Sequence, residues 1–511
     1  MLPPRIKWLT ESVSTKVTRK TSQDTKQREK KEFNIFMALL PLLLMITAMG
    51  TAVIWLGQDP HLPLIFGTAS AAIVALFYGY KWKEIEDMMY KGIRLALPAI
   101  VIIILVGLVI GSWIGGGIVA TMIYYGLALI SPALFLVTIT LLCAIVALSI
   151  CSSWSTMATV GVAGMGIGMS MGIPPAMVAG AVISGSYFGD KMSPMSDTTN
   201  LASGLTNTDL FVHIKHMFYT TIPGLIIALT AFFFLGRQFG GQGNANDAEI
   251  AGMMQSLDGQ FIISPWLLLV PLTVIICIAF KMSAIPALIV GIVLGFLCHI
   301  IVQGGDLGTA IATLQGGYVI ESNNDMINEL FNNGGLESMM YTVSMTIVAM
   351  TFAGILEYSG MLQAIMKQVI KIAKGTLGIV TSTIVAAFAT NATCSEQYIS
   401  IVVPSRMFLR TYIEKNLHSK NLSRALEDGG TLTSVFIPWN TCGVFIYGVL
   451  GVAAWEYAPY AIFNMVVPFI SILLAATGIG IEKISDAERQ EFLDKHYGEE
   501  KTKESLTTET V

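Results

Sequence analysis

The sequence predicts an all-α polytopic membrane protein. Of its 511 residues, 54% are hydrophobic and only 13% are charged, whereas a typical soluble domain carries about 25% charged residues. The mean hydropathy is +0.67. The apolar segments are mostly continuous runs of about 17 to 23 residues, which is the length of a membrane-spanning helix. They do not alternate with the period of two that barrel strands require.

The distribution of charge divides the chain into five parts. Residues 1–33 are basic and polar, with no apolar run before a cleavage site, so we expect a tail and not a signal peptide. By the positive-inside rule, both termini are expected on the cytoplasmic side. The parts are a disordered basic cytoplasmic tail (1–33), a first repeat (34–237), an extracytoplasmic linker (238–263), a second repeat (264–481) and a charged, disordered cytoplasmic tail (482–511).

The first repeat opens with two spans joined by a short turn and continues through a basic amphipathic linker. A polar cluster then interrupts an apolar run, as in a re-entrant hairpin or two short spans. We expect spans at 35–56 and 62–80, the linker at 81–94, a span at 95–114, an interfacial segment at 118–130, the hairpin at 133–171, a broken span at 176–205 and a span at 222–235.

The second repeat begins on the opposite side of the membrane. A long stretch without Lys or Arg contains an acidic loop, which therefore belongs outside. We expect spans at 266–280 and 284–302 with a cytoplasmic turn between them, a span at 341–356, a polar-centred hairpin at 375–404, a broken span at 431–451 and a span at 460–481; basic residues after 404, Arg424 included, mark a cytoplasmic loop.

The two halves match in the order of their elements. The segment 193–197 in the first half corresponds to 437–441 in the second, and each contains a proline. Inverted repeats with discontinuous helices at the midplane are the architecture of secondary transporters. We therefore expect two inverted repeats, with about ten transmembrane helices plus two re-entrant hairpins.

A charged stretch at 189–202 lies between two apolar runs and contains Asp190, Lys191 and Asp197. Ionisable groups at membrane depth are costly, so such a break indicates an ion or substrate site. A small cation that loses its water needs carboxylate, hydroxyl, amide and carbonyl oxygens as ligands. Four polar breaks supply them and could converge on one site.

The candidate ligands are residues at these four breaks whose side chains carry oxygen atoms. They are Asp190, Ser196, Asp197 and Thr198 in the first broken span, Ser153, Ser155 and Thr156 in the first hairpin, Asn391 and Thr393 in the second hairpin, and Asn440 and Thr441 in the second broken span. Pro194 and Pro438 are the helix-breaking residues.

Asp197 is the carboxylate at the break itself, where the second half has Asn440 or Thr441. Burial favours the neutral form of a carboxylate and a bound cation favours the charged form, so Asp197 can exchange a proton for a metal ion. Lys191 either neutralises a carboxylate when the cation is absent or forms a structural ion pair. Asp190 either binds the ion or caps the helix at the break.

Other patterns argue against catalysis. No Ser/His/Asp, HExxH or CxxC arrangement is present, so we expect neither an enzyme nor a cofactor. No feature indicates a nucleic-acid partner. An ion channel is the other transport class, but it needs a through-going pore, whereas an internal inverted repeat favours alternating access.

The motif SGSYFGDKMSPMSDTTNLA at 184–202 and the cluster SSWST at 152–156 closely resemble the NhaC family of bacterial Na+/H+ antiporters. The likeness extends over roughly residues 33–481. It implies Na+/H+ exchange in a bacterial cytoplasmic (inner) membrane, with a transport domain that moves like an elevator. The hypothesis drawn from the residues is that Na+ binds at Asp197.

The expected partners follow from this resemblance. They are Na+, H+, membrane lipid and a second copy of the chain in a homodimer. The same family includes an exchanger of malate and protons for sodium and lactate. The resemblance therefore leaves open a Na+/H+-coupled carboxylate exchanger, in which a small carboxylate travels too.

Overall fold

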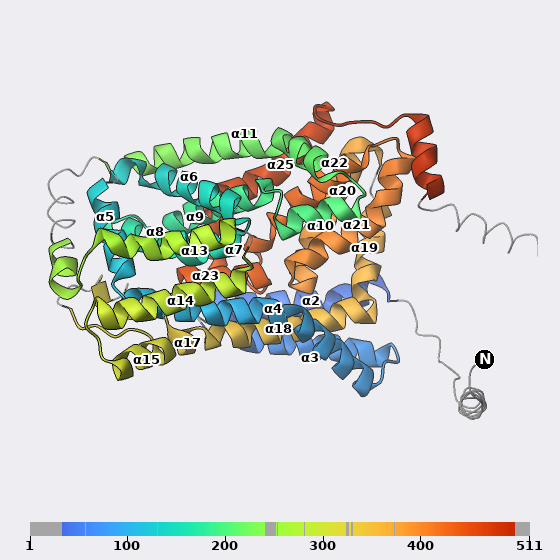
Figure 1. Ribbon diagram of the computed structural model, residues 1–511. Coiled ribbons are helices and arrows are strands. Elements are labelled where there is room, and N and C mark those ends of the chain that lie inside the picture. Colours follow the sequence, from blue (N-terminus) through green and yellow to red (C-terminus); the bar gives the residue numbers. More distant parts are fainter. Residues whose placement is uncertain are drawn as a thin grey trace, which may run out of the picture.

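The computed structural model describes residues 33–495 apart from 57, 130, 241–251, 253, 281, 323–326, 329–330 and 372–373. Residues 1–32 of the expected tail, and residues 241–251 and 253 of the expected linker, lie outside the described residues. Within these ranges the regular structure is helical, apart from one isolated bridge between Leu417 and Lys483. Most of the long helices run side by side along one direction (Figure 1).

The first half comprises ten α-helices and two π-helical segments among the described residues. They are α2 (Ile35–Met49), η1 (Gly50–Trp55), α3 (His61–Phe77), α4 (Trp82–Gly115), α5 (Ile118–Leu129), α6 (Pro132–Ile150), α7 (Ser153–Thr156), η2 (Met157–Gly161), α8 (Val162–Ser170), α9 (Pro175–Met192), α10 (Asp197–Leu205) and α11 (Leu210–Arg237).

The second half is also built of helices among the described residues. Its elements are η3 (Pro265–Leu268), α13 (Leu269–Ala279), α14 (Ala284–Ile301), α15 (Leu307–Gly316), α17 (Gly335–Ser338), α18 (Met340–Ser359), α19 (Met361–Lys371), α20 (Gly375–Cys394), α21 (Gln397–Glu414), α22 (Ser419–Leu426), η4 (Glu427–Thr431), η5 (Ser434–Phe436), α23 (Thr441–Leu450), α24 (Ala454–Tyr457), η6 (Ala458–Tyr460) and α25 (Ile462–Thr477).

Six of the described helices are long and apolar enough to cross a membrane, or up to nine spans if each of three bent helix pairs counts as one. This confirms a polytopic, all-helical membrane protein. The helix α5 crosses the ends of its neighbours (Figure 1), in agreement with the expected interfacial segment. The expected number of spans stays a prediction.

Two helices are longer than the sequence predicted. The linker at 81–94 is not separate from the span after it, because α4 is one helix of 34 residues that contains Pro98. Likewise α21 passes through Pro404 and ends at Glu414. A proline inside a membrane helix removes one backbone hydrogen bond but need not end the helix when its neighbours satisfy the freed groups.

The two predicted hairpins turn with the same backbone conformation. Cys151 after α6 and Ser395 after α20 both adopt left-handed backbone, with φ of 63° and 55°. The next residue in each turn, Ser152 and Glu396 respectively, is extended, and its side chain caps the helix that follows. Each hairpin thus presents a helix N-terminus directly after its turn.

Both broken spans contain the predicted proline break. The breaks lie at 193–196 between α9 and α10 and at 437–440 between η5 and α23. The first and last residues of each break have extended backbone, and Pro194 and Pro438 occupy the second position. The charged stretch 189–202 is therefore helical except at this centre.

The second broken span is longer than predicted at its N-terminal side. It begins with α22 and bends by 49° at the break, so residues before 431 belong to it. Arg424, Glu427 and Asp428 in this arm are 0% exposed. The expected cytoplasmic loop at Arg424 is wrong, because these charged residues are enclosed by protein and not by water.

Part of the predicted C-terminal tail is packed against the chain. The backbone N–H of His418 donates to the carbonyl of Glu482 at 3.0 Å, and that of Ile484 donates to the carbonyl of Asn416 at 3.1 Å. Disorder of the tail is therefore wrong for this segment. Residues 496–511 lie outside the described residues.

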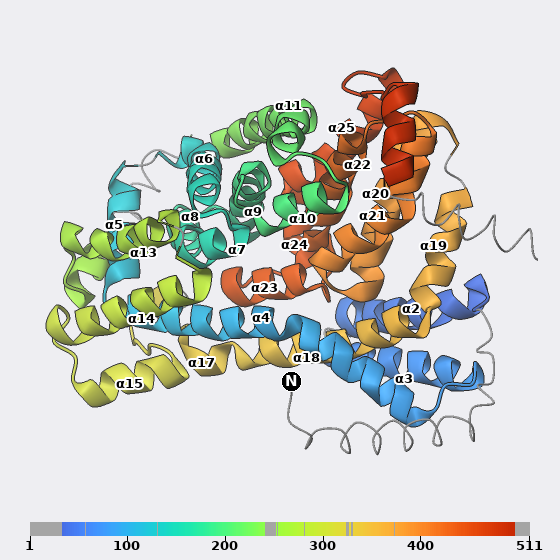
Figure 2. The same cartoon turned by 45° about the vertical axis from the view of Figure 1, so that its right-hand side comes forward.

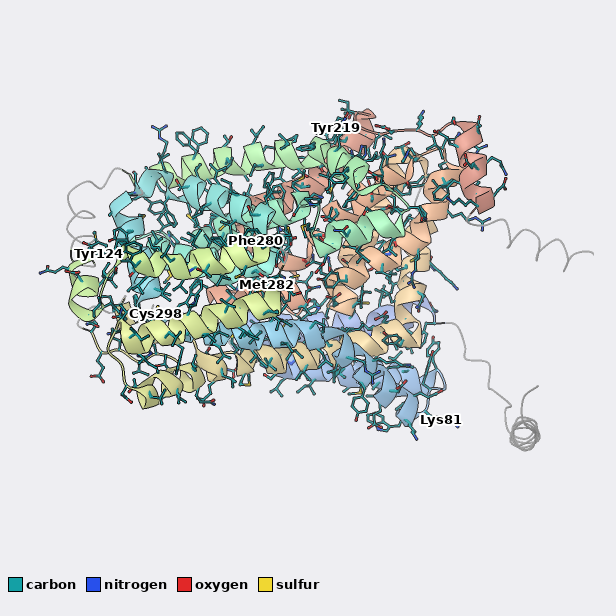
Figure 3. The ribbon with its side chains drawn as sticks, viewed as in Figure 1. Lys81, Tyr124, Tyr219, Phe280, Met282 and Cys298 are labelled. Carbon is teal, nitrogen blue, oxygen red and sulfur yellow. The ribbon has the colours of Figure 1, made fainter. Side chains whose placement is uncertain are left out.

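The turn between α13 and α14 does not reach the end of the molecule. Lys81 and Tyr124 mark opposite ends in Figure 3, and Phe280 and Met282, on either side of the turn, lie between them. The sequence predicted a cytoplasmic turn here because 266–280 and 284–302 are apolar enough for full spans. These helices instead end beside the middle of the molecule.

The breaks of both halves meet toward the middle of the helical array. The helices α7, α9, α10 and α23 lie together there in both views (Figures 1 and 2). Trp154 in α7 stacks on Phe445 in α23, with 4.1 Å between the ring centroids. This contact joins the first hairpin to the second broken span.

Candidate cation-binding site

A cavity of about 550 Å³ opens where the first hairpin, the first broken span and the second hairpin meet. The helix α4 and the turn between α13 and α14 complete its wall. Its polar lining residues are Ser152, Ser153, Ser155, Asp190, Ser196, Asp197, Thr198, Ser283, Glu396, Gln397 and Tyr398. Three of the four predicted polar breaks therefore meet at one cavity.

Asp190 links the first broken span to the first hairpin. Its Oδ2 accepts hydrogen bonds from the backbone N–H of Ser153 at 3.0 Å and from the Ser153 hydroxyl at 2.7 Å. The left-handed turn at Cys151 directs this N–H group toward α9. Asp190 thus does cap a helix, but the one that begins at Ser153 and not a helix of its own broken span.

Asp197 is the first residue of α10 and faces the cavity. In the described part of the chain its carboxylate accepts no hydrogen bond, and the side chain is exposed. The adjacent hydroxyls of Ser196 and Thr198 lie 3.2 Å apart. A negative charge at a helix N-terminus is favoured by the helix dipole, so Asp197 can remain charged there and receive a cation.

The second hairpin contributes residues that are not among the predicted ligands. Glu396 caps α21, since its Oε2 accepts from the N–H groups of Tyr398 at 2.6 Å and Ile399 at 3.2 Å. Gln397 and Tyr398 also line the cavity, and the sequence singled out neither of them. Their position directly after a polar turn was the available signal.

The amide ligands predicted in the second half lie elsewhere. The Asn440 amide donates to the carbonyl of Asn391 at 3.2 Å, and the Asn391 amide donates to the carbonyl of Gly430 at 2.7 Å. The hydroxyl of Thr393 bonds to its own helix at Ala389. The expected convergence of all four breaks is therefore wrong, because the fourth break satisfies its polar groups with its own hairpin.

Two further candidates, Thr156 and Thr441, donate hydrogen bonds to backbone carbonyl groups. The Thr156 hydroxyl donates to the carbonyl of Ser152 at 2.9 Å and does not line the cavity, whereas Ser155 does. Thr441 uses its N–H to bond the carbonyl of Ser395 at 2.9 Å. This bond connects the second hairpin to the second break.

Lys191 pairs with a carboxylate that the sequence did not single out. Its Nζ lies 2.9 Å from Asp428 Oδ1, and both side chains are 0% exposed. The Thr220 hydroxyl donates to the same oxygen at 3.1 Å. The structure therefore places Lys191 in an ion pair away from Asp190 and Asp197, and the signal for its partner was the pair of acids at 427–428.

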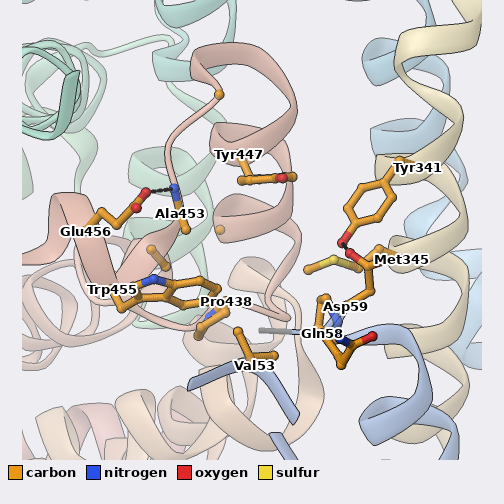
Figure 4. A pocket seen from close by; sticks show the side chains of 14 residues that line it. Val53, Gln58, Asp59, Tyr341, Met345, Pro438, Tyr447, Ala453, Trp455 and Glu456 are labelled. Carbon is orange, nitrogen blue, oxygen red and sulfur yellow. Dashed lines mark hydrogen bonds between the residues drawn. The ribbon is translucent and has the colours of Figure 1, made fainter. Parts of the chain in front are cut away.

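A second cavity of about 420 Å³ is lined in part by Pro438 of the second break (Figure 4). Asp59 accepts a hydrogen bond from the Tyr341 hydroxyl at 2.9 Å, and Glu456 accepts one from the Ala453 N–H at 2.9 Å. Both carboxylates of this cavity therefore already accept a hydrogen bond from the protein. The free carboxylate of Asp197 distinguishes the first cavity from it.

The donor set suits an alkali cation. No group of three or more His, Cys, Asp or Glu residues that could hold a metal ion is present among the described residues. The first cavity instead combines the carboxylates of Asp190, Asp197 and Glu396 with several hydroxyls. Such oxygen ligands replace the hydration shell of a small hard cation.

Comparisons with known proteins find similarity to families of membrane transporters. A model of the Na+/H+ antiporter family matches residues 185–479, and one of the C4-dicarboxylate anaerobic carriers matches residues 8–236. The chain is 38% identical to the Na(+)/H(+) antiporter NhaC of Alkalihalophilus pseudofirmus, over 89% of this chain and 98% of that protein. Identity to the NhaC of Bacillus subtilis is 36%, over 87% and 98%. Identity to the malate-2H(+)/Na(+)-lactate antiporter of Bacillus subtilis is 33%, over 87% and 95%.

Proposed function

Because the chain belongs to the NhaC family of Na+/H+ antiporters, and so exchanges Na+ for H+ across a membrane, we propose that the cavity beside Asp197 is where the two ions exchange. The observation that carries the proposal is the carboxylate of Asp197, which has no hydrogen-bond partner in the described chain and faces a cavity with a second carboxylate.

The exchange follows from competition for one carboxylate. Na+ binds when Asp197 is charged, with the hydroxyls of Ser196 and Thr198 beside it. A proton on Asp197 removes the charge that holds Na+, so one ion replaces the other. Asp190 adds a second negative charge and holds the first hairpin in place through Ser153.

Alternating access is supported by the matched geometry of the two halves. The hairpin turns at Cys151 and Ser395 have the same backbone conformation, and so do the two proline breaks. We propose that these are inverted repeats at 34–237 and 264–481, with both termini cytoplasmic and no cofactor. A homodimer in the bacterial inner membrane is part of the same proposal.

A carboxylate exchanger is the second candidate. Two observations favour it: one relative is named as a malate and lactate antiporter, and a dicarboxylate-carrier family matches the first 236 residues in part. The N-termini of α10 and α21 both meet the cavity, and helix N-termini favour anions. The three acidic side chains of the cavity oppose an anion, so Na+/H+ exchange is the function we retain.

Asp197→Asn is expected to abolish exchange, because the amide cannot carry the exchanged proton or charge. The assay is the sodium-dependent collapse of a preset pH gradient in inverted vesicles, followed by fluorescence quenching. Asp87→Asn is the matched control, since Asp87 is exposed on α4 and pairs only with Lys91 at the surface. Normal exchange by the Asp197 variant, at equal amounts of folded protein, would remove Asp197 from the site.

A further inference from the structure

A second set of buried carboxylates lies in the N-terminal arm of the second broken span, outside the cavity. Glu427 and Asp428 begin the π-helical segment η4 and are both 0% exposed. Residues of α10, α20, α21 and α25 pack around this segment. None of the exchange steps proposed above uses either side chain.

Several buried oxygens of this region accept no hydrogen bond from the described residues. Both oxygens of Glu427 and the hydroxyl of Thr431 are buried without a hydrogen bond in the described part of the chain. The hydroxyl of Thr198 also faces Glu427. Buried polar atoms in folded proteins almost always have a partner, and an orphaned group indicates a water or an ion at that place.

The nearby charges do not neutralise Glu427. Its charged neighbours are Lys191 and Asp190. Lys191 is bound by Asp428 at 2.9 Å and forms no ion pair with Glu427 among the described residues. Arg424, one turn earlier, donates to the carbonyl of Gly480 at 2.9 Å, toward the end of α25. When Glu427 is charged, its buried carboxylate therefore has free lone pairs and is costly without a bound cation.

We propose that Glu427, with the hydroxyls of Thr431 and Thr198, forms a second, occluded binding site for a sodium-sized alkali cation. The carboxylate supplies the charge and two ligand oxygens, and the two hydroxyls supply neutral ligands. Thr198 lines the exchange cavity as well, so its side chain is shared by the two proposed sites. The proposal rests on the Na+/H+ exchange of this chain but not on Asp197 as its place.

The test counts bound ions on the full-length protein. Purified protein in detergent is titrated with radioactive 22Na+ at alkaline pH, and binding is followed by scintillation proximity. We expect two Na+ per wild-type chain and one in Glu427→Gln. Glu414→Gln is the matched control, because Glu414 is half exposed and pairs on its own helix with Arg410, and it should keep both ions.

A second variant protects the test against misfolding. Thr431→Ala removes a hydroxyl that makes no hydrogen bond in the described chain, so it should fold and weaken one Na+ site about tenfold, the typical effect of losing one neutral ligand contact. A wild-type count in Glu427→Gln, or wild-type affinity in Thr431→Ala, would overturn the proposal and leave Glu427 as a neutral, protonated acid.

This experiment can refute either of the two proposed sites without refuting the other. Asp197→Asn should lose the other ion, and the double variant should bind none. If Asp197→Asn keeps both ions while Glu427→Gln loses one, the second site stands and the cavity proposal fails. The reverse pattern retains the cavity and overturns the site at Glu427.

Discussion

The two aspartates of the cavity differ in their hydrogen bonds, and this difference indicates their roles. Asp190 accepts two bonds from Ser153 and is buried, whereas Asp197 accepts none in the described chain and faces the cavity. A carboxylate that is held by fixed donors changes its charge at a cost to the structure around it. Asp197 is therefore the group that can exchange ions freely, and Asp190 sets the geometry beside it.

Ser153→Ala is expected to raise the sodium concentration for half-maximal exchange about tenfold, because it removes a hydrogen bond to a charged group. The Ser153 N–H still bonds to Asp190, so the hairpin should keep its position. The sodium dependence of vesicle exchange measures the effect. Ser149→Ala is the control, since its hydroxyl bonds only to Ile145 on the same exposed helix face, and an equal shift in both variants would refute the role of Ser153.

At the level of elements, the crossing of α4 and α18 depends on two glycines. A Cβ atom on Gly92 would lie 2.1 Å from the carbonyl oxygen of Met350 and 2.9 Å from the Cα of Gly354. A Cβ on Gly354 would lie 2.3 Å from the carbonyl oxygen of Met88. The backbones therefore approach closely at this crossing, as small residues allow in membrane helices.

Gly92→Ala is expected to destabilise the protein by about 1–3 kcal/mol, the usual cost of overpacking a tight contact. Thermal unfolding of the detergent-solubilised protein measures the change. Gly50→Ala is the control, because a Cβ atom on Gly50 would meet nothing within 4 Å. A melting temperature equal to that of the wild type would show that the helices can separate without loss.

At the level of the whole molecule, the cavity joins segments from both halves of the chain. The hairpin turns after Cys151 and Ser395 meet there, together with the break before Asp197. A movement of one half relative to the other would therefore change access to the same site. This arrangement suits an exchanger in which Na+ and H+ occupy the same site in turn.

Uptake of labelled malate or lactate tests the whole-molecule function. We expect no sodium-dependent uptake of either anion into vesicles, because Asp190, Asp197 and Glu396 make the cavity acidic. The same vesicles should show sodium-dependent proton movement. Saturable malate uptake that requires sodium and is lost in Asp197→Asn would instead favour the carboxylate exchanger.

The sequence by itself determined the helical class, the position of both hairpins and both proline breaks, and the carboxylate at the first break. Each of these depends on local features, namely apolar length, prolines, and polar residues within apolar runs. The sequence did not predict that the charged segment 419–431 belongs to the second broken span, because charged residues near the end of a span usually indicate a loop.

Only the tertiary structure decided which polar groups meet. Asp190 bonds to Ser153, 37 residues away, and Lys191 pairs with Asp428, 237 residues away. Asn391 and Asn440 are joined by a hydrogen bond and do not line the cavity, whereas Glu396 and its neighbours do. A sequence specifies that a buried polar side chain needs a partner, but helix packing selects the partner, because contacts between distant segments follow from the shape of the whole fold.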